Sequence, residues 1–176
     1  FYVRKENKIA PIPAEFKHYG VNLLPDENAA LFVLPAPGKS FVYLTGDFND
    51  WGVDEDLQMN VSIDQKTFWL RLDDLDPEEE YAYQYIIDGE LKLADPYARK
   101  VLDPYNDGFI PEDIYPDLKA YPYKSTSDLV SSFRLEEESY AWKTQGYEPP
   151  ASSDLQIYEL LIRDFVEDHS YRSVID

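Results

Sequence analysis

The sequence contains no cysteine, which excludes disulfides and thiolate metal sites and leaves no indication of the redox compartment. Basic residues are scarce: 16 Lys and Arg stand against 35 Asp and Glu, for a formal net charge of −19. This charge repels phosphate backbones and anionic lipids, so nucleic acids and membrane surfaces are poor partners, whereas a neutral ligand such as a sugar is not repelled. No apolar run approaches the ~20 residues that a membrane-spanning helix needs.

The composition is nevertheless that of a folded chain. Of the 176 residues, 44% are hydrophobic and 15% aromatic, enough for one domain with a core, or one domain and a fragment of another. The chain begins at Phe1 rather than Met, as a processed or truncated protein does. A removed signal peptide would leave no trace, so the localisation stays open.

The stretch Phe41–Trp51 is the most informative segment. Over Phe41–Asp47, hydrophobic residues occupy both alternating faces, which predicts a β-strand covered on both sides. The loop that follows holds Phe48 and Trp51 three residues apart. Two large rings at a strand end either plug a core or offer a flat surface to a ligand, and the pattern alone leaves both alternatives open.

Further short strands surround this one, with turn residues between them. Asp88–Gly89 is a two-residue hairpin signal of type I′, because both residues tolerate positive φ. The pattern predicts an all-β antiparallel sandwich over residues 20–95, preceded by a leader over residues 1–19. The expected strands are Gly20–Leu24, Ala29–Leu34, Phe41–Asp47, Leu57–Ile63, Thr67–Leu72, Tyr81–Ile87 and Leu91–Ala94.

Proline recurs after the sandwich, with many tyrosines in between. Because proline interrupts helices and central strands, residues 96–153 are expected to form an irregular connector, and their aromatic content predicts that it packs against a surface. The prolines are Pro96, Pro104, Pro111, Pro116, Pro122, Pro149 and Pro150.

Residues 154–176 predict the beginning of a second, incomplete domain. Leu155–Ile162 is nearly continuous in apolar residues, as is typical of a strand buried on both faces of a parallel sheet. Ser170 can cap a helix in which Tyr171, Val174 and Ile175 keep helical spacing. Left without its sheet, the run Leu155–Ile162 would expose an unpaired apolar strand and favour dimerisation or disorder.

No metal site or cofactor is predicted. The acidic turn Asp73–Glu80 has oxygen ligands suited to calcium, but its spacing matches no defined calcium loop, and a solvated turn explains it. His18 and His169 are isolated in the sequence, so neither is assigned a metal or catalytic role.

Four motifs resemble a known pair of families. Gly46–Trp51, Tyr83–Gly89 and Ala94–Ala98 resemble carbohydrate-binding module family 48, the early-set, immunoglobulin-like domains that precede catalytic barrels. Ile157–Phe165 resembles the first barrel strand of glycoside hydrolase family 13, the α-amylase, pullulanase, isoamylase and branching-enzyme group. The motifs occur in the order found in that family.

The resemblance implies an (α/β)8 barrel that acts on α-glucans such as starch or glycogen by a retaining, two-carboxylate mechanism. In the family the catalytic carboxylates lie on later barrel strands, so the resemblance implies no catalytic residue in this chain. We therefore expect the chain itself to be inactive and its parent protein to be a glycoside hydrolase or a glucan branching enzyme.

In glucan-binding members of the family, a tryptophan at the position of Trp51 stacks on a glucose ring, and a lysine and a second tryptophan complete the site. This sequence has Gln84 and Leu91 at those two positions. Gln84 can still hydrogen-bond a hydroxyl, whereas Leu91 offers no flat ring. Trp51 and Gln84 are thus the candidate carbohydrate-binding residues, with packing of Trp51 and Phe48 in the sandwich or against the barrel as the alternative.

The function expected from these observations is that of an accessory domain that mainly supports the catalytic barrel, with Asp95, Pro96 and Tyr97 in contact with it. One alternative is an autonomous α-glucan-binding module acting through Trp51. Another is an immunoglobulin-like protein-interaction domain, which leaves the barrel-strand run unexplained.

Two further expectations concern individual side chains. Trp69 is expected to pack against the proline-rich segment rather than to form a surface ring. Arg163 and Asp164 are expected to form an ion pair in the barrel rather than to line a substrate groove.

Overall fold

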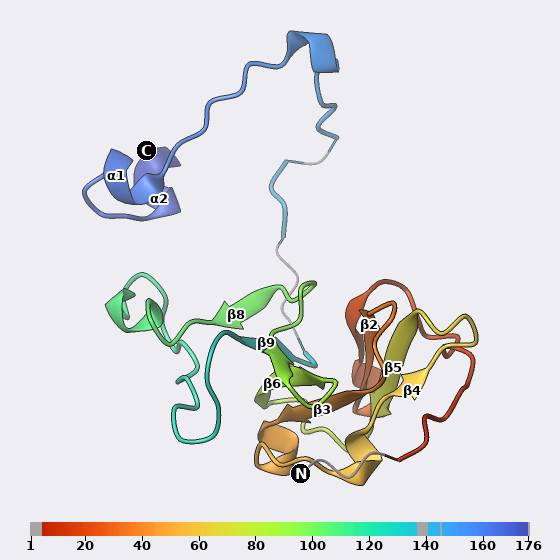
Figure 1. Ribbon diagram of the computed structural model, residues 1–176. Helices are drawn as coiled ribbons and strands as arrows, with labels where there is room; N and C mark the ends of the chain where they lie inside the picture. The colour runs from red at the N-terminus through yellow and green to blue at the C-terminus, as the bar shows by residue number, and fades with distance from the viewer. Residues whose placement is uncertain (1–4, 137–140, 145, 176) are drawn as a thin grey trace. The chain divides into compact units, whose positions relative to one another are not determined.

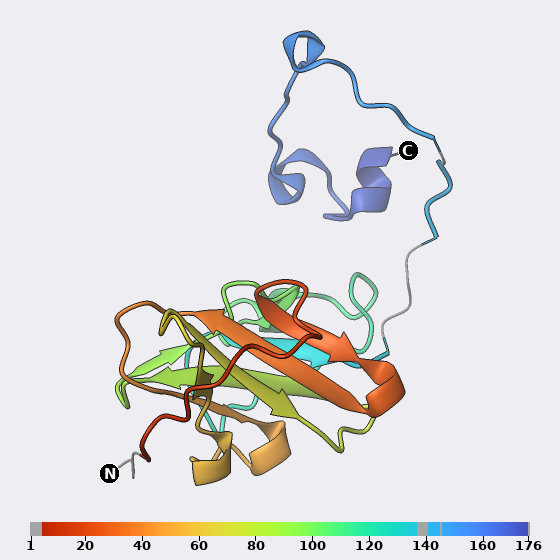
Figure 2. The ribbon, with the colours of Figure 1, turned by 90° about the vertical axis from the view of Figure 1, so that its right-hand side faces the viewer.

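The computed structural model describes residues 5–136, 141–144 and 146–175. The chain divides into two compact units, Phe1–Glu137 and Glu138–Asp176. The first unit contains every strand of the described residues, arranged as two antiparallel sheets (Figure 1). Figure 2 shows the same two layers from the side. The all-β sandwich expected from the sequence is therefore confirmed. In the part of the chain that the structure describes, no helix is long and apolar enough to cross a membrane.

The first sheet has four strands in the order β1-β2-β5-β4. Its strands are β1 (Gly20–Leu24), β2 (Ala29–Pro35), β4 (Asn60–Val61) and β5 (Thr67–Leu72). A short 3-10 turn, η1 (Pro25–Glu27), joins β1 to β2 and ends at Asn28, whose φ of 49° lies in the left-handed region. The chain then returns antiparallel, with Leu24 opposite Ala29.

The second sheet has five strands, with β3-β6-β9-β8 in order and β7 also paired to β6. At the predicted type I′ turn between β6 and β7, Asp88 and Gly89 have φ values of 53° and 75°. The positive φ expected at both positions is thus present. The strands are β3 (Val42–Gly46), β6 (Glu80–Ile87), β7 (Leu91–Leu93), β8 (Lys100–Leu102) and β9 (Val130–Arg134).

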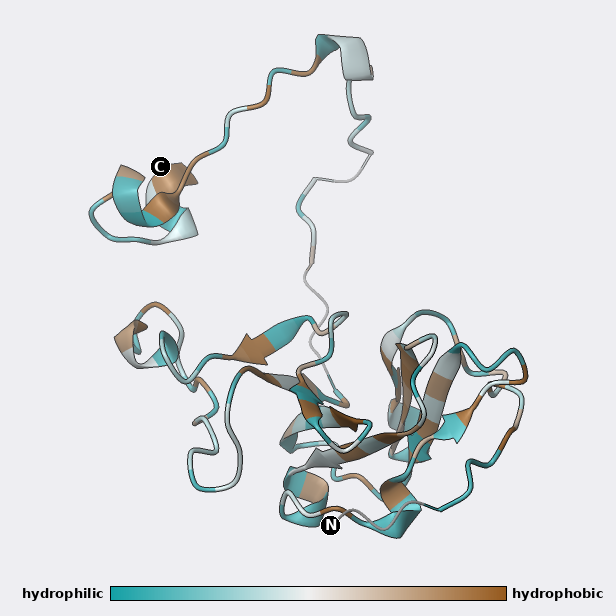
Figure 3. Ribbon diagram, viewed as in Figure 1, coloured by the Kyte–Doolittle hydropathy of each residue, from teal (hydrophilic) through white to brown (hydrophobic). Residues whose placement is uncertain are grey.

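The core lies between the two sheets and centres on Phe32 of β2, which is fully buried. The centroid of its ring lies 5.1 Å from that of Tyr83 and 5.4 Å from that of Phe133, both in edge-to-face geometry. These aromatic contacts join the first sheet to β6 and β9 of the second. Figure 3 shows the apolar residues on the strands in brown.

The expectation that residues 96–153 are irregular is wrong at two places, β8 and β9. β9 is an inner strand of the second sheet, with Glu80 of β6 opposite Arg134 and Lys100 of β8 opposite Ser132. Neither strand contains proline, because β8 lies between Pro96 and Pro104 and β9 between Pro122 and Pro149. The sandwich therefore extends beyond residue 95, and two of its strands come from the proline-rich part of the chain.

The segment between β8 and β9, residues 103–129, covers the outer face of the second sheet, as expected for an aromatic segment that is not a free linker. We call it the covering segment. Tyr121 forms a buried cluster with Ala82, Leu102 and Val130, and Leu118 packs against this cluster. The Tyr121 hydroxyl donates a hydrogen bond to the Asp128 carbonyl at 2.6 Å, and this bond joins two parts of the same segment. Strands β3, β6 and β9 of the second sheet are thus largely buried on both faces, whereas β7 and much of β8 stay accessible.

The leader packs along the edge of the first sheet. Ile9 forms a parallel bridge with Val61, and the Ala10 amide donates to the Val61 carbonyl at 2.9 Å. The Trp69 indole N–H donates to the Ala10 carbonyl at 3.2 Å. Trp69 therefore packs against the leader and not against the proline-rich segment, which corrects the expectation for this side chain. The leader also covers the edge strand β4, whose backbone groups would otherwise be open to pairing.

The second unit contains η5 (Ser152–Asp154), α1 (Ile162–Phe165) and α2 (Tyr171–Ile175). No described residue after 140 is buried. The expected strand over Leu155–Ile162 is absent, because a strand requires a neighbour to pair with and the ladders of the described residues include none for this run. The predicted cap is confirmed: the Ser173 amide donates to Ser170 Oγ at 3.2 Å, at the start of α2.

Candidate functional site

The loop between β3 and Trp51 is held by its own polar side chains. Asn49, in η2 (Asp47–Asn49), accepts a hydrogen bond from the Gly46 amide at 3.0 Å and donates to the Gly52 carbonyl at 2.9 Å. Asp50 and Trp51 have φ values of 50° and 61°, in the left-handed region. Two successive residues in this region turn the chain sharply, so the motif encodes a rigid turn whether or not it binds a ligand.

Gly46 is required at the start of this turn by close packing. A Cβ atom placed there would lie 2.3 Å from the Ala82 carbonyl oxygen of the neighbouring strand, and 2.9 Å from the Phe48 ring. Its φ of 175° is extended backbone that any residue adopts. The reason for glycine is therefore the approach of β6 and not the backbone conformation.

The Asp47 carboxylate joins three parts of the first unit. Oδ1 accepts the Trp51 indole N–H at 2.9 Å, and Oδ2 accepts the Ala82 amide of β6 at 2.9 Å. Lys119, from the segment that covers the second sheet, lies 3.1 Å from Oδ2. Since the carboxylate ties the loop to β6 and to the covering segment, its role in the structure is positional.

The two rings of the loop lie in different places. Phe48 packs against the central core, with its ring centroid 6.4 Å from that of Phe32. Trp51 packs against the outer cluster that contains Tyr121, and it is half-buried. The rings therefore do not form one flat surface. Packing was the alternative that the sequence left open. It accounts for the position of Phe48 and for the buried part of the Trp51 ring. Glucan binding by Trp51 stays a prediction.

Gln84 is fully buried on β6, and its amide is used within the chain. Nε2 donates to the carbonyls of Ser127 and Leu129, both at 2.8 Å, and Oε1 accepts the Thr126 hydroxyl. Both N–H groups are spent on the covering segment, so Gln84 offers no donor to a sugar hydroxyl. The prediction that Gln84 contacts carbohydrate therefore has no support in this geometry, because the chain itself occupies that face.

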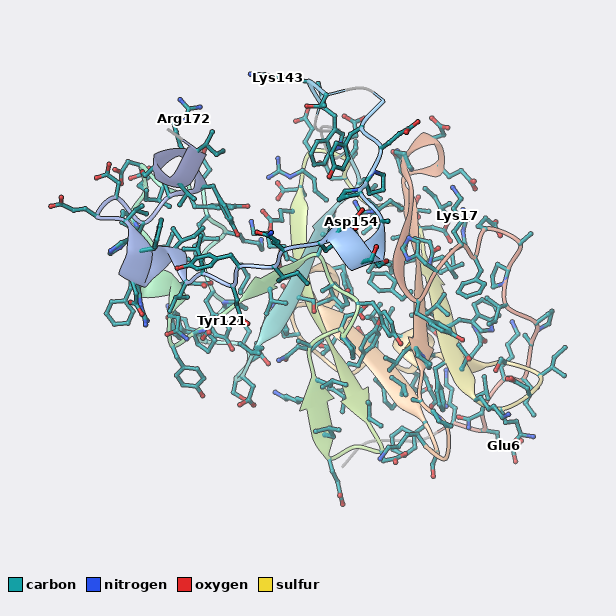
Figure 4. All side chains as sticks on the ribbon, turned by 90° about the horizontal axis from the view of Figure 1, so that it is seen from above. Glu6, Lys17, Tyr121, Lys143, Asp154 and Arg172 are labelled. Carbon is teal, nitrogen blue, oxygen red and sulfur yellow. The ribbon has the colours of Figure 1, made fainter. Side chains whose placement is uncertain are left out.

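Leu91, at the start of β7, is 48% exposed. Other aromatic rings lie near Trp51 and were missed by sequence reasoning. A pocket of about 420 Å³ is lined by Tyr115, Tyr121 and Tyr123, and by Leu118 and Lys119. Tyr121 (labelled in Figure 4) and Leu118 also belong to the cluster against which Trp51 packs. The density of tyrosine in this segment was the only signal in the sequence.

Asp95 is a buried carboxylate, only 3% exposed, and its environment is complete within the first unit. Oδ2 accepts the hydroxyls of Tyr83 at 2.8 Å and Tyr85 at 3.1 Å, and Oδ1 accepts the Tyr97 amide at 2.8 Å. Burial, and then the nearby charge of Asp95, raise the pKa of the Tyr83 hydroxyl well above its ordinary value. Burial is also the main cause of the raised pKa of Tyr85. Both tyrosines are thus kept neutral as donors to the carboxylate.

The segment that follows Asp95 forms one wall of an open groove of about 600 Å³. Its lining is largely apolar and comes from β7, β8 and the end of the covering segment, with Leu93, Pro96, Val101 and Leu129 among its residues. Of the three residues expected to contact another domain, Asp95 is buried with its oxygens engaged, whereas Pro96 and Tyr97 are exposed. Only Pro96 and Tyr97 are therefore accessible to a partner.

Among residues 5–136, 141–144 and 146–175, no group of three or more His, Cys, Asp or Glu side chains is placed to hold a metal ion. Arg163 and Asp164 form an ion pair with each other, with Nε and Oδ1 3.1 Å apart, and their side chains are 71% and 64% exposed. Such an exposed pair contributes little to stability.

Comparison with known proteins gives one relevant similarity. The chain is 28% identical over 160 residues to a 1,4-alpha-glucan-branching enzyme of Yarrowia lipolytica (strain CLIB 122 / E 150), in a match that covers 88% of this chain. It covers only 21% of that enzyme, so the chain spans about a fifth of the length of this relative. No family model matches the chain.

Proposed function

We propose that this chain is the N-terminal accessory region of a protein that acts on α-glucans, namely a glucan branching enzyme of the α-amylase group, and that its sandwich mainly supports the catalytic barrel. The similarity to a 1,4-alpha-glucan-branching enzyme over 88% of the chain supports the α-glucan setting. The motifs that resemble carbohydrate-binding module family 48 support an accessory domain.

The observation that most supports this role is the burial and internal hydrogen bonding of the Gln84 side chain. Its buried amide donates to Ser127 and Leu129 and accepts from Thr126, all in the segment that covers the outer face of the second sheet. A glucan placed on this face would first have to displace the covering segment. That displacement would break the three hydrogen bonds of the Gln84 amide, at a net cost of about 0.5–1.5 kcal/mol each. Supporting a neighbouring domain requires no such change.

The groove beside Pro96 and Val101 is the surface that we assign to the catalytic barrel. It is apolar and open, and its volume of about 600 Å³ suits side chains of a packed neighbour. The experiment is Val101→Glu in the complete enzyme, with Ile63→Glu as the matched control. Val101 is 39% exposed in the groove, and Ile63 is 70% exposed at the turn before β5.

We expect Val101→Glu to lower the melting temperature and activity of the complete enzyme, while Ile63→Glu leaves both unchanged. Residues 1–176 alone should tolerate both substitutions, because each side chain is already partly in water. Equal effects of the two substitutions in the complete enzyme would contradict the assignment of the groove.

The second candidate function, an autonomous α-glucan-binding module, is favoured by one observation. The pocket lined by Tyr115, Tyr121 and Tyr123 lies beside the cluster that holds Trp51. Tyr123 is 66% exposed and could stack on a sugar ring. Titration with maltoheptaose, followed by tryptophan fluorescence, separates the two functions. A saturable change that Trp51→Ala abolishes would establish binding, and no change up to ~10 mM ligand would exclude it.

For the second unit, we propose that Leu155–Ile162 becomes the first strand of the barrel when the barrel is present. Ile157 is 88% and Leu161 59% exposed, so the run has apolar surface to bury. Without the barrel this surface favours self-association. Ile157→Asp should make residues 1–176 more monomeric in sedimentation experiments, and an unchanged association constant would show that another surface is responsible.

A further inference from the structure

A group of large apolar side chains is exposed on the covering segment, shortly after the end of β8 (Figure 1). Phe109, at 83%, is the most exposed large hydrophobic side chain that the structure describes in the first unit. The other members of the group are Tyr105, Ile110, Ile114 and Tyr115. Single apolar side chains on a surface are common, whereas several large ones within eleven residues indicate a contact surface.

Phe109 stands on a turn that is held by its own polar side chains. Asp103 accepts the Tyr105 amide on Oδ1 at 2.8 Å and the Asn106 side-chain amide on Oδ2 at 2.6 Å. Asp107 Oδ2 accepts the Asp103 amide at 2.8 Å, which closes the turn from the other side. In η4 (Asp107–Phe109), the Phe109 amide donates to the Asn106 carbonyl at 3.0 Å. Because the backbone of Phe109 is fixed before a partner arrives, less entropy is lost on association.

The turn is also joined to the second sheet. The Tyr123 hydroxyl donates to the Pro104 carbonyl at 3.0 Å, and the Tyr123 ring lies 4.7 Å from that of Tyr121. Tyr121 in turn belongs to the buried cluster that contains Leu102 of β8 and Val130 of β9. A partner bound at Phe109 would therefore be held against the sandwich itself.

The tip of the turn protrudes. A Cβ atom added to Gly108, the residue before Phe109, would have no other atom within 4 Å. Sites for small molecules are concave, so a protruding ring is not the base of such a site. A protruding ring fits instead into an apolar pocket of a packed protein domain, as the central side chains of protein interfaces do.

The charge around Phe109 restricts the partner further. Residues 103–117 contain five Asp and Glu and no Lys or Arg. The basic side chains on either side of this stretch are engaged, with Lys100 Nζ 2.9 Å from Glu80 and Lys119 Nζ 3.1 Å from Asp47. This acidic border repels an anionic membrane, and in a symmetric contact with a second copy it would place like charges opposite one another. It favours a different surface that carries basic groups.

The exposed group continues the groove that we assign to the barrel. Tyr105, four residues before Phe109, lines that groove together with Val101 and Leu129. The chain spans only about a fifth of the length of its relative, so most of a protein of that size lies outside residues 1–176. A domain that fills the groove would also reach the turn of Phe109.

We infer that Phe109 is an interface anchor, which inserts into an apolar pocket bordered by Lys or Arg on the part of the longer protein outside residues 1–176. The inference rests on the proposed function, because it requires that longer protein. It assigns the covering segment a second role: residues 118–129 pack on the sheet, and the turn before them holds the neighbouring domain.

The test is the reactivity of a cysteine placed beside the anchor. Because the chain has no cysteine, Gly108→Cys introduces a single thiol into residues 1–176, at a position with room for its Cβ. Ile63→Cys is the matched control at another exposed turn. Labelling by N-ethylmaleimide is followed by mass spectrometry of the modified peptide, in residues 1–176 and in the longer protein. The Gly108→Cys variant should react at least about tenfold more slowly in the longer protein, and the Ile63→Cys variant equally fast in both.

Equal rates for the Gly108→Cys variant in the two proteins would overturn the inference. Slow labelling in residues 1–176 alone would overturn it as well. If dilution then restored fast labelling, the occupant would be a second copy of the chain. If dilution had no effect, the occupant would be a segment of the same chain.

Phe109→Ser, combined with Gly108→Cys, separates the ring from the turn. It should leave the melting temperature of residues 1–176 unchanged, because the ring is already in water, and should restore fast labelling in the longer protein. Phe109→Leu keeps an apolar side chain and should retain slower labelling than Phe109→Ser. Equal labelling of the two variants would show that the ring is not the anchor.

Charge reversal tests the basic border of the partner. Glu112→Lys should speed the labelling of the Gly108→Cys variant in the longer protein, whereas Glu79→Lys, at an exposed position before β6, should not. Equal effects of the two reversals would contradict a basic border.

Val101→Glu tests the proposed function separately. If it destabilises the longer protein while the Gly108→Cys variant labels equally fast in both proteins, the groove contact stands and the anchor is overturned. If neither effect is observed, both are overturned.

Discussion

The two units of the chain are both rich in apolar residues, yet among the described residues only the first has buried side chains. In the first unit, Phe32, Tyr83 and Phe133 bring their rings within 5.7 Å of one another between two sheets. In the second, Ile157 and Tyr158 are 88% and 79% exposed. The difference lies in the partners: the strands of the first unit pair with one another, whereas Leu155–Ile162 pairs with no strand of the residues that the structure describes. Apolar sequence therefore predicts burial only where the chain also supplies a surface to bury it against.

The largest expected effect comes from truncating the central ring of the first unit. Phe32→Ala should lower the free energy of unfolding by about 3–5 kcal/mol, because it removes a fully buried ring and leaves a cavity. Ile157→Ala is the counterpart in the second unit and should change it by less than about 0.5 kcal/mol. Urea denaturation followed by circular dichroism measures both. A loss of more than about 2 kcal/mol for Ile157→Ala would show that the second unit has a core of its own.

The next effect concerns the buried carboxylate of the first unit. Asp95→Asn should destabilise the sandwich by about 2–3 kcal/mol, since the amide cannot accept all the bonds from Tyr83, Tyr85 and the Tyr97 amide. Asp113→Asn, at an exposed position, is the control and should be neutral. Thermal unfolding of the two variants makes the comparison, and equal melting temperatures would refute a structural role for Asp95.

A smaller effect is expected from the pH dependence of the Glu80 cluster, in which the Glu80 carboxylate accepts the Ser132 hydroxyl at 2.7 Å and lies 2.9 Å from Lys100 Nζ. Burial opposes ionisation of Glu80, but the hydrogen bonds from Lys100 and Ser132 outweigh it, so the pKa of Glu80 is lowered. A carboxylate whose folded pKa is depressed stabilises the fold above its unfolded pKa, and this stability is lost as the pH falls through the folded value.

Glu80→Gln should therefore flatten the decline in the free energy of unfolding between about pH 5 and pH 3, with a difference on the order of 1 kcal/mol. Glu79→Gln, a neighbour that is exposed, provides the control. If both variants keep the wild-type pH profile, the Glu80 cluster does not contribute.

The strands with local signals could be predicted from the sequence. Period-2 alternation and turn residues predicted β1 and β5 at their observed bounds and placed β3 and β6 to within a residue at each end. The left-handed pair Asp88 and Gly89 followed from the tolerance of these two residues for positive φ. Each of these features depends on residues that are close together in the sequence.

The features that were missed depend on distant residues. β9 carries Ser131 and Ser132, which have no strong strand preference, and it is stabilised by pairing with β6. The hydrogen bonding of Gln84 could not be predicted either, because its amide donates to carbonyls 43 and 45 residues away. Spacing along the chain gives no signal for such contacts.

Amide hydrogen exchange over Leu155–Ile162, measured for residues 1–176 and for the longer protein to which we propose that they belong, tests the contrast between the two units most directly. We expect the run to exchange rapidly in residues 1–176, where β6 and β9 are protected, and slowly in the longer protein, where we propose that it pairs inside a barrel. Strong protection of Leu155–Ile162 in monomeric residues 1–176, or rapid exchange of the run in the longer protein, would contradict the account.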